Sequence, residues 1–237
     1  MSFYGMPGMA SMPSGDTAGP PSVAMDQQTS LFRYGEQSIW STYFFAGSAA
    51  VAQSVNRTFQ TQIGGTGQGF TRGLTIGETN IKQGGRVPNG IAYDVFGISA
   101  HIMAATAATD VAGTDWDATI NSDVLITNAT NIMYNAVLTW DFTQTRIDVA
   151  PLSLCGSGGG VFGSIGIVAN NEQRAGHLGN GPGSIWLYRK HPVSLPGETT
   201  FAMLIQFGNR AATITANNAM GVKITLFGYY KNVIEIG

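Results

Sequence analysis

Two β-type stretches in the last fifth of the chain constrain the fold most. "LPGETTFAMLIQFG" at 195–208 combines a Pro-Gly turn with an apolar run, and "GVKITLFGYY" at 221–230 has a similar texture. Successive side chains of a strand point to opposite faces. In the second stretch one face therefore carries Val222, Ile224, Leu226 and Gly228, and the other carries Lys223, Thr225, Phe227 and Tyr229. We expect the first face to lie in a core and the mixed second face to be partly buried against another subunit.

Strand signals separated by turns continue through most of residues 54–236, and long amphipathic helices are nearly absent. The turn "GRVPNG" is expected to open a central strand, because Pro88 sets φ and Asn89-Gly90 is a strong turn signal. That central strand is "IAYDVFGISAHIMAA" at 91–105. Further strands are predicted within 54–63, 69–76, 131–144, 145–154, 184–190, 211–216 and 232–236.

Residues 31–53 are ambiguous. Trp40, Tyr43 and Phe44 follow helical spacing, but Gly47 interrupts that stripe, and dense aromatic residues also suit strands. We predict either a short helix or an extended segment that covers a sheet edge.

The pattern predicts an all-β protein rather than βαβ units. Roughly eight to ten strands favour a single jelly-roll β-sandwich with long loops. A double jelly roll stays open, although it needs about sixteen strands. We assign residues 31–237 to this one domain, and residues 1–30, rich in Met, Gly, Pro and Ser, to a flexible N-terminal arm.

Charge is sparse along the chain. Asp, Glu, Lys and Arg make up 11% of the residues, against about 25% in typical globular domains. Because the cores of protein interfaces are depleted of charge, this composition favours a chain whose outer surface is buried against neighbouring copies. A secreted β protein with a Ser/Thr/Asn surface is the alternative. The net charge of -2 and the lack of a basic arm predict weak or no direct binding of nucleic acid.

No residue pattern predicts catalysis, a cofactor or a metal site, so we expect a protein that is not an enzyme. His101, His177 and His191 lack the spacing of zinc ligands, and His101 is expected to be a core or interface histidine. "GGGVFG" at 158–163 matches a dinucleotide motif only formally, because no helical stripe follows it. Asp110, Asp115, Asp117 and Asp123 form an acidic loop that is more often solvated than ion-binding.

Processing and redox signals are also weak. Cys155 is the only cysteine, which excludes an intrachain disulfide. The first 28 residues lack the basic and apolar regions of a signal peptide, and no stretch of eighteen apolar residues is present. These features predict assembly in a cytoplasm.

The layout resembles that of a viral protein family. "NRTFQTQIGGTGQGFTRGLTIGETNIKQGGRVPNG" and "RKHPVSLPGETTFAMLIQFG…VKITLFGYY" resemble the opening and closing parts of jelly-roll coat proteins from small tailless icosahedral bacterial viruses. The resemblance covers about 200 residues and implies a homo-oligomeric capsomer, a self-assembled shell, location in the virion and no catalytic residues. Minor capsid or vertex proteins are further expected partners. Contact with the genome or an internal membrane stays open, because no basic arm is present.

Two other functions remain as alternatives. A carbohydrate-binding or adhesive β-sandwich, such as a fibre or spike module, requires Trp116 or Trp186 to form an exposed platform beside polar groups. A cupin-like or hydrolytic jelly-roll enzyme ranks last, because the three histidines are not clustered.

Overall fold

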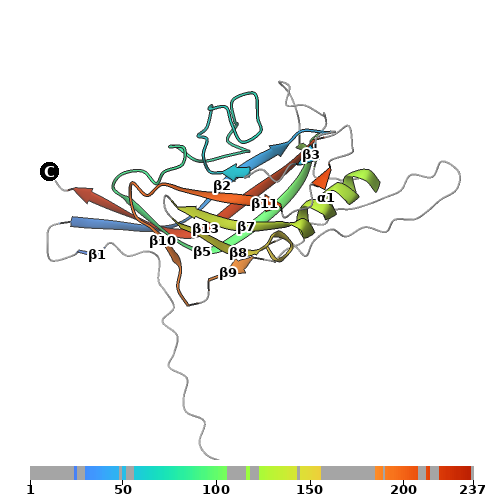
Figure 1. The fold of residues 1–237 in the computed structure, drawn as a ribbon. Helices are drawn as coiled ribbons and strands as arrows, with labels where there is room; N and C mark the ends of the chain where they lie inside the picture. The colour runs from blue at the N-terminus through green and yellow to red at the C-terminus, as the bar shows by residue number, and fades with distance from the viewer. Residues whose placement is uncertain are drawn as a thin grey trace, which may run out of the picture.

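The computed structural model describes residues 24–25, 30–47, 50–51, 56–105, 116–117, 123–142, 145–155, 185–188, 190–207, 212–213 and 219–235. Within them the chain is mostly β and forms two stacked antiparallel sheets (Figure 1). The prediction of an all-β sandwich is therefore confirmed. The Gly-rich stretch at 155–183, expected to be one of the long loops, lies outside these residues except for Cys155, and so does most of the N-terminal arm.

Sheet I contains the three longest strands: β2 (Ser30–Phe45), β5 (Ile91–Ala105) and β13 (Met220–Glu235). β13 lies between β2 and β5 and is antiparallel to both. The outer edge of β2 pairs with β1 (Ala24–Met25). Three short strands share the other edge of β5, namely β6 (Trp116–Asp117), β9 (Trp186–Leu187) and β10 (Val193–Leu195).

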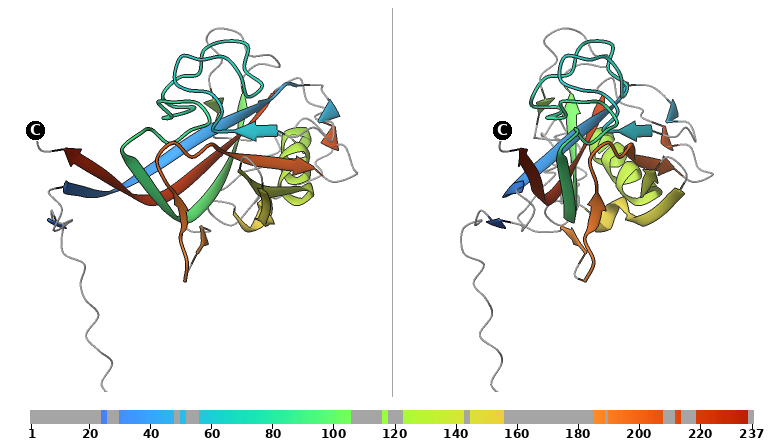
Figure 2. Two further views of the ribbon diagram at one scale, coloured as in Figure 1. Left: turned by 60° about the vertical axis from the view of Figure 1, so that its left-hand side comes forward. Right: turned by 90° about the vertical axis from the view of Figure 1, so that its left-hand side faces the viewer.

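Sheet II is shorter and has the order β4-β11-β7-β8. Its strands are β4 (Asn56–Thr58), β7 (Ala136–Phe142), β8 (Thr145–Pro151) and β11 (Phe201–Phe207). Figure 2 shows that β2 and β13 run together past the strands of sheet II toward the C-terminus. A separate pair joins β3 (Ala50–Val51) to β12 (Ala212–Thr213).

The two strands predicted in 195–208 and 221–230 are therefore central strands of different sheets. β11 is bordered by β4 and β7, and β13 by β2 and β5. The inner face of β13 is apolar, as predicted: Val222, Ile224 and Leu226 are fully buried in the core between the sheets. On the other face, Lys223, Thr225 and Phe227 are half-buried and Tyr229 is exposed.

The core lies between the inner faces of the two sheets. Sheet I contributes Val95, Ile98, Ala100 and Ile102 from β5, and sheet II contributes Leu138, Trp140, Phe201, Met203 and Ile205. The rings of Trp140 and Phe142 stack at 5.6 Å between centroids, and Trp140 donates a hydrogen bond from Nε1 to the hydroxyl of Tyr188 at 2.9 Å. An apolar core filled from both sheets accounts for a chain that folds with few helices.

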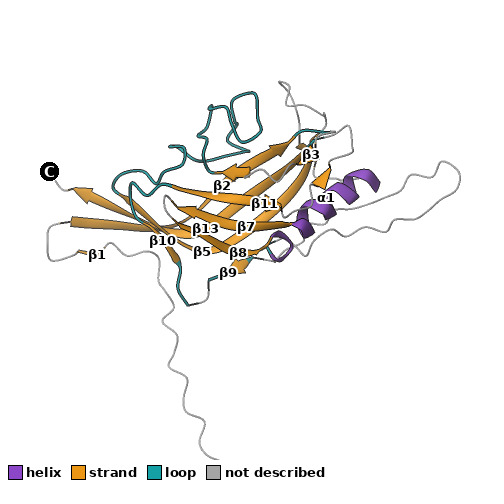
Figure 3. Cartoon of the chain, in the orientation of Figure 1, coloured by secondary structure: helices purple, strands orange, loops and turns teal. Residues whose placement is uncertain are grey.

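Of the two alternatives for 31–53, the helix is wrong and the extended conformation is right, because β2 is a strand through Phe45 (Figure 3). This segment is a strand of sheet I, however, and not a cover on its edge. Its alternation is hidden in the sequence because both faces of the strand are buried along 41–45. Ser41 and Phe45 face inward, while Thr42 and Phe44 face outward beneath the loop formed by residues 59–90.

The loop 59–90 covers the free edge of β2. The backbone N–H of Phe44 donates to the carbonyl of Gln68 at 2.8 Å, and the backbone N–H of Trp40 donates to Oδ1 of Asn80, also at 2.8 Å. Gly69 has φ +84°, and a Cβ there would lie 2.0 Å from the carbonyl oxygen of Phe44, so this close approach requires glycine. Side-chain and backbone groups of the loop thus satisfy an edge that would otherwise be open to strand addition.

Two predicted strands in this region are wrong or too long. In the described part of 54–63, which is 56–63, β4 is the only strand, because Phe59 has φ 64° and ends it while its ring enters the core. Residues 69–76 form turns and bends with one isolated bridge, between Gly67 and Phe70, instead of a strand. The predicted turn at 85–90 is confirmed, since Gly90 has φ +76° and β5 begins at Ile91.

The strand predicted over 131–144 begins too early. Residues 123–135 form the helix α1 (Asp123–Asn135), and β7 begins only at Ala136. Ala129, Ile132 and Met133 are buried on one side of α1, at the spacing of a helical face. A short 3₁₀ helix, η1 (Leu152–Leu154), follows β8 and ends the predicted strand at Pro151 as expected.

Candidate interaction surfaces

The histidines and acidic residues considered for chemistry do not come together in the described part of the chain. His101 lies on the outer face of β5, whereas His191 is exposed just before β10. His177, Asp110 and Asp115 lie outside the described residues, and only the backbones of Asp117 and Asp123 are described. Among the described residues, no group of three His, Cys, Asp or Glu side chains is placed to hold a metal ion.

Cys155 lies in the core between the sheets and is fully buried. Burial raises the pKa of its thiol to about 12, because the thiolate would lose its hydration there. Since the thiolate is the reactive form of cysteine, this residue packs as a small apolar side chain.

Trp116 packs flat against sheet I instead of forming an open platform. Its ring lies 6.0 Å from that of Phe44 and 6.2 Å from that of Phe70, both at steep angles. A Cβ on Gly221 would lie 2.4 Å from the ring, so the indole rests directly on the backbone of β13. Trp186 is also half-buried and packs against the main core.

Glu78 holds this outer cover in place through five hydrogen bonds. Arg72 donates from both terminal nitrogens, at 2.8 Å from Nη1 and 2.5 Å from Nη2. Thr75 donates from its backbone N–H at 2.8 Å and from its hydroxyl at 3.0 Å, and Trp116 donates from Nε1 at 3.0 Å. The Glu78 side chain is only 2% exposed, so the carboxylate is buried but paired.

These contacts set the ionisation of the cluster. Burial raises the pKa of Glu78, but the hydrogen bonds from Arg72, Thr75 and Trp116 outweigh it, so the net pKa is lowered. Across β13, burial lowers the pKa of Lys223, and Glu78 partly offsets this. Burial, and then the charge of Lys223, lower the pKa of His101, which is the β5 residue paired with Lys223. This histidine therefore favours its neutral form.

Farther along the same outer face, apolar side chains are exposed to solvent. Ile185 is 39% exposed, Leu187 is 49% exposed and Tyr229 is 48% exposed. The ring of Phe96 contacts that of Tyr229 at 5.0 Å between centroids, and Phe227 is half-buried beside Gly97. We call this set the outer patch; its members are Phe96, Ile185, Leu187, Phe227 and Tyr229.

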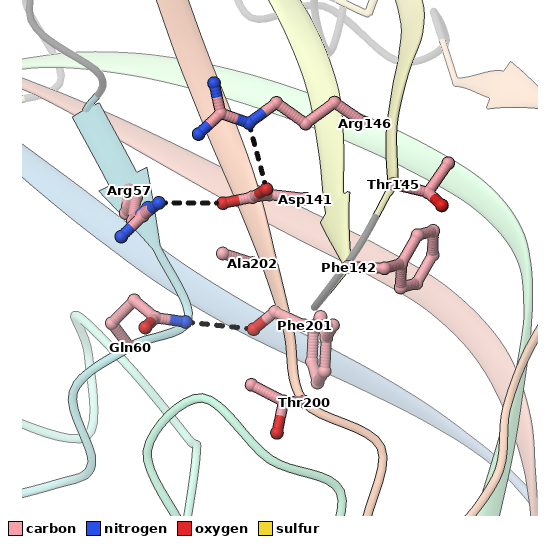
Figure 4. Close-up of a pocket in the computed structure, with 9 residues that line it drawn as sticks. All are labelled: Arg57, Gln60, Asp141, Phe142, Thr145, Arg146, Thr200, Phe201 and Ala202. Carbon is pink, nitrogen blue, oxygen red and sulfur yellow. Dashed lines mark hydrogen bonds and ion pairs between the residues drawn. The ribbon is translucent and has the colours of Figure 1, made fainter.

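The outer face of sheet II carries a polar hollow of about 540 Å³. The small side chain of Ala202 on β11 lies between longer side chains from the other three strands, namely Arg57 on β4, Asp141 on β7 and Arg146 on β8 (Figure 4). Gln60, Phe142, Thr145, Thr200 and Phe201 complete the lining.

Asp141 binds both arginines of the hollow. Its Oδ2 lies 3.1 Å from Nη2 of Arg57, and its Oδ1 lies 3.1 Å from Nε of Arg146. The arginine side chains are 49% and 52% exposed, whereas that of Asp141 is 15% exposed. Both guanidinium groups therefore keep much of their surface open to the solvent that fills the hollow.

Sequence reasoning identified the mixed outer face of β13 but missed both charged clusters. The alternation of "VKITLFGYY" predicted that Phe227 and Tyr229 face outward. Glu78 and Trp116 are 38 residues apart, and Arg57 and Asp141 come from strands that are not adjacent in the chain. The only local signal for the hollow was Asp141 and Arg146, which face each other across the β7–β8 pair.

Comparison with known protein families, with curated proteins and with solved structures finds no significant match for this chain. Among the described residues, no helix is long and apolar enough to cross a membrane.

Proposed function

We propose that this protein is a single jelly-roll structural subunit that self-assembles, as the capsid subunit of a small tailless icosahedral bacterial virus. The strand pairing supports the jelly roll. Taken in chain order, the eight main strands pair first with last and so inward: β2 with β13, β4 with β11, β5 with β10 and β7 with β8. All four pairs are antiparallel, and they are divided between two sheets. A long hairpin rolled into a sandwich has this nested pattern.

Jelly rolls occur in viral capsids, in lectins and in cupins, so the topology alone does not choose among these functions. The observation that carries the capsid proposal is the outer patch. Three of its side chains are 39–49% exposed on the outer face of sheet I: Tyr229 on the central strand β13, and Ile185 and Leu187 at or beside the edge strand β9. Contiguous exposed apolar surface on a rigid sheet is typical of a protein interface. The 11% charged composition agrees with an exterior that is covered by neighbouring copies.

The carbohydrate-binding alternative has less support. Both tryptophans that would form a sugar platform are half-buried, with Trp116 held by Glu78 and Trp186 against the core. Sugar stacking requires an open ring face. This alternative stays a prediction, and binding of a glycan by the unassembled protein would support it.

Electron microscopy of the purified full-length protein tests the proposal. We expect closed particles of uniform size as the protein concentration is raised. Leu187→Lys combined with Tyr229→Lys places two charges in the outer patch and is expected to abolish them. Tyr134→Lys is the matched control, because Tyr134 is 67% exposed on α1, away from the patch, and its replacement should leave particles intact. A wild-type protein that stays monomeric at every concentration, with and without divalent ions, would contradict the proposal.

A further inference from the structure

We propose that the hollow on the outer face of sheet II is an oxyanion site that takes a phosphate group through Arg57 and Arg146. Three of the nine lining residues are ionisable, and they carry two positive charges and one negative charge. The hollow therefore has an excess of one positive charge, although the chain as a whole has a net charge of -2. A local excess of this sign attracts an anion to this face in particular.

Arg57 and Arg146 each use only part of their hydrogen-bond donors on Asp141. Arg57 uses Nη2 on Asp141, and Arg146 uses Nε on Asp141. Neither makes another hydrogen bond or ion pair with the described residues, so both terminal nitrogens of Arg146 and the Nη1 and Nε groups of Arg57 remain open. Guanidinium N–H groups bind phosphate and carboxylate oxygens in bidentate geometry, and such charge-assisted bonds are stronger than neutral ones.

Asp141 is expected to be a positioning residue for this site. Figure 4 shows its carboxylate between the two guanidinium groups, with one oxygen bound to each. Asp141 on β7 is the strand-pairing partner of Arg146 on β8 and of Ala202 on β11. The backbones that carry Asp141 and Arg146 are therefore held by the hydrogen bonds of sheet II. The arginines are therefore fixed on either side of one point above the sheet.

Two arginines in one hollow favour phosphate over a single carboxylate. A phosphate has oxygens that point in several directions and can bind two guanidinium forks at once, whereas a carboxylate offers two oxygens in one plane. The volume of about 540 Å³ lies within the range of small-ligand pockets, so a phosphate attached to a larger molecule also fits. The hydroxyls of Thr145 and Thr200 line the same space.

A further carboxylate, that of Asp148, lies on the same face of sheet II. Asp148, paired with Thr139 in the neighbouring row, accepts a hydrogen bond from the Thr139 hydroxyl at 2.7 Å. It does not line the hollow, and its charge is expected to weaken the site without occupying it.

Titration calorimetry of the full-length protein with inorganic phosphate at low ionic strength tests the site. We expect saturable binding that weakens as sodium chloride is added. Arg57→Gln and Arg146→Gln are each expected to reduce the affinity at least tenfold. Both side chains are about half exposed, so the variants should fold. Arg86→Gln is the matched control: Arg86 is 46% exposed, pairs with Glu198 outside the hollow, and its loss should change the affinity less than twofold.

A mixed-sequence single-stranded oligonucleotide in a second arm distinguishes the sources of the phosphate group. Tighter binding of the oligonucleotide than of inorganic phosphate, lost in the same two variants, would identify a nucleic-acid phosphate. Equal or weaker binding would identify a small phosphorylated ligand. No phosphate binding by the wild type, or binding that both variants retain, would overturn the proposal. The outer patch lies on the other sheet, so this result is independent of whether particles form.

Discussion

The outer faces of the two sheets bear carboxylates in opposite situations. Over sheet I, Glu78 of the loop 59–90 is 2% exposed and accepts five hydrogen bonds within the cover that this loop and Trp116 form. On sheet II, Asp141 pairs with two arginines that are about half exposed above an open hollow. The buried carboxylate therefore holds the cover of sheet I together, whereas the cluster on sheet II presents its positive charge to solvent.

The largest loss of stability is expected when the Glu78 carboxylate is removed, and a much smaller loss when the Asp141 carboxylate is removed. Glu78→Ala removes the buried carboxylate that accepts from Arg72, the Trp116 indole N–H and the Thr75 amide, and should lower the free energy of unfolding by about 3–5 kcal/mol. Asp141→Ala removes two ion pairs whose arginine side chains are about half exposed and can return to solvent, and should cost about 1 kcal/mol or less. Urea denaturation of both variants measures the difference. Equal losses would show that the two clusters play the same role.

The contact between the Trp116 ring and Gly221 of β13 is expected to contribute the next largest share of stability. Gly221→Ala places a methyl group where the indole ring now lies, at 2.4 Å, so the ring must move and its bond to Glu78 must weaken. We expect a loss of about 1–3 kcal/mol, as for overpacking in a core. Gly77→Ala is the control, because its Cβ would meet only the Thr75 hydroxyl at 3.7 Å. If Gly221→Ala were as stable as the control, the Trp116 ring would not lie against Gly221 in the folded protein.

The smallest expected effect is the dependence of stability on pH. The folded-state pKa of His101 is lowered from its usual 6.5, so the unfolded chain binds a proton at higher pH than the folded protein does. The contribution of neutral His101 to the free energy of unfolding is fully present above pH 6.5. It is lost as the pH falls through the lower pKa that His101 has in the folded protein. Glu78, whose pKa is lowered from 4.5, adds a further decline below that pH. Urea titrations at several pH values should show both steps.

The His101→Gln variant should lose the first step while it keeps the second. Glu78→Gln should lose the second step and start from a lower stability. If the wild-type protein became more stable on acidification from pH 7 to pH 5, the outer face of sheet I would not have the electrostatics described above.

Sequence periodicity identified strands where one face is buried and the other is not. β5 was predicted with its observed bounds, and β13 was predicted with its correct inner face, because Val222, Ile224 and Leu226 alternate with less buried residues. For β2 the pattern did not separate a strand from a helix, because the cover on sheet I buries both faces of the strand along 41–45 and hides the alternation there. A strand buried on both sides cannot be told from a helix by pattern alone.

The helix α1 and the two charged clusters were missed for different reasons. Ala129, Ile132 and Met133 have helical spacing, but the alternation of β7 that follows them suggested a longer strand. The clusters at Glu78 and Asp141 form only when segments far apart in the chain are brought together by the pairing of sheets. No local pattern encodes such contacts, so the structure was needed to find them.

Sedimentation velocity over a wide range of concentration tests the central claim, that the outer patch of sheet I is buried by other copies of the chain. We predict that the wild-type protein forms large species as its concentration rises, and that Leu187→Lys with Tyr229→Lys sediments as a 25.0 kDa monomer with unchanged stability to urea. Wild-type and variant proteins that both sediment as monomers, or that assemble equally well, would contradict the account.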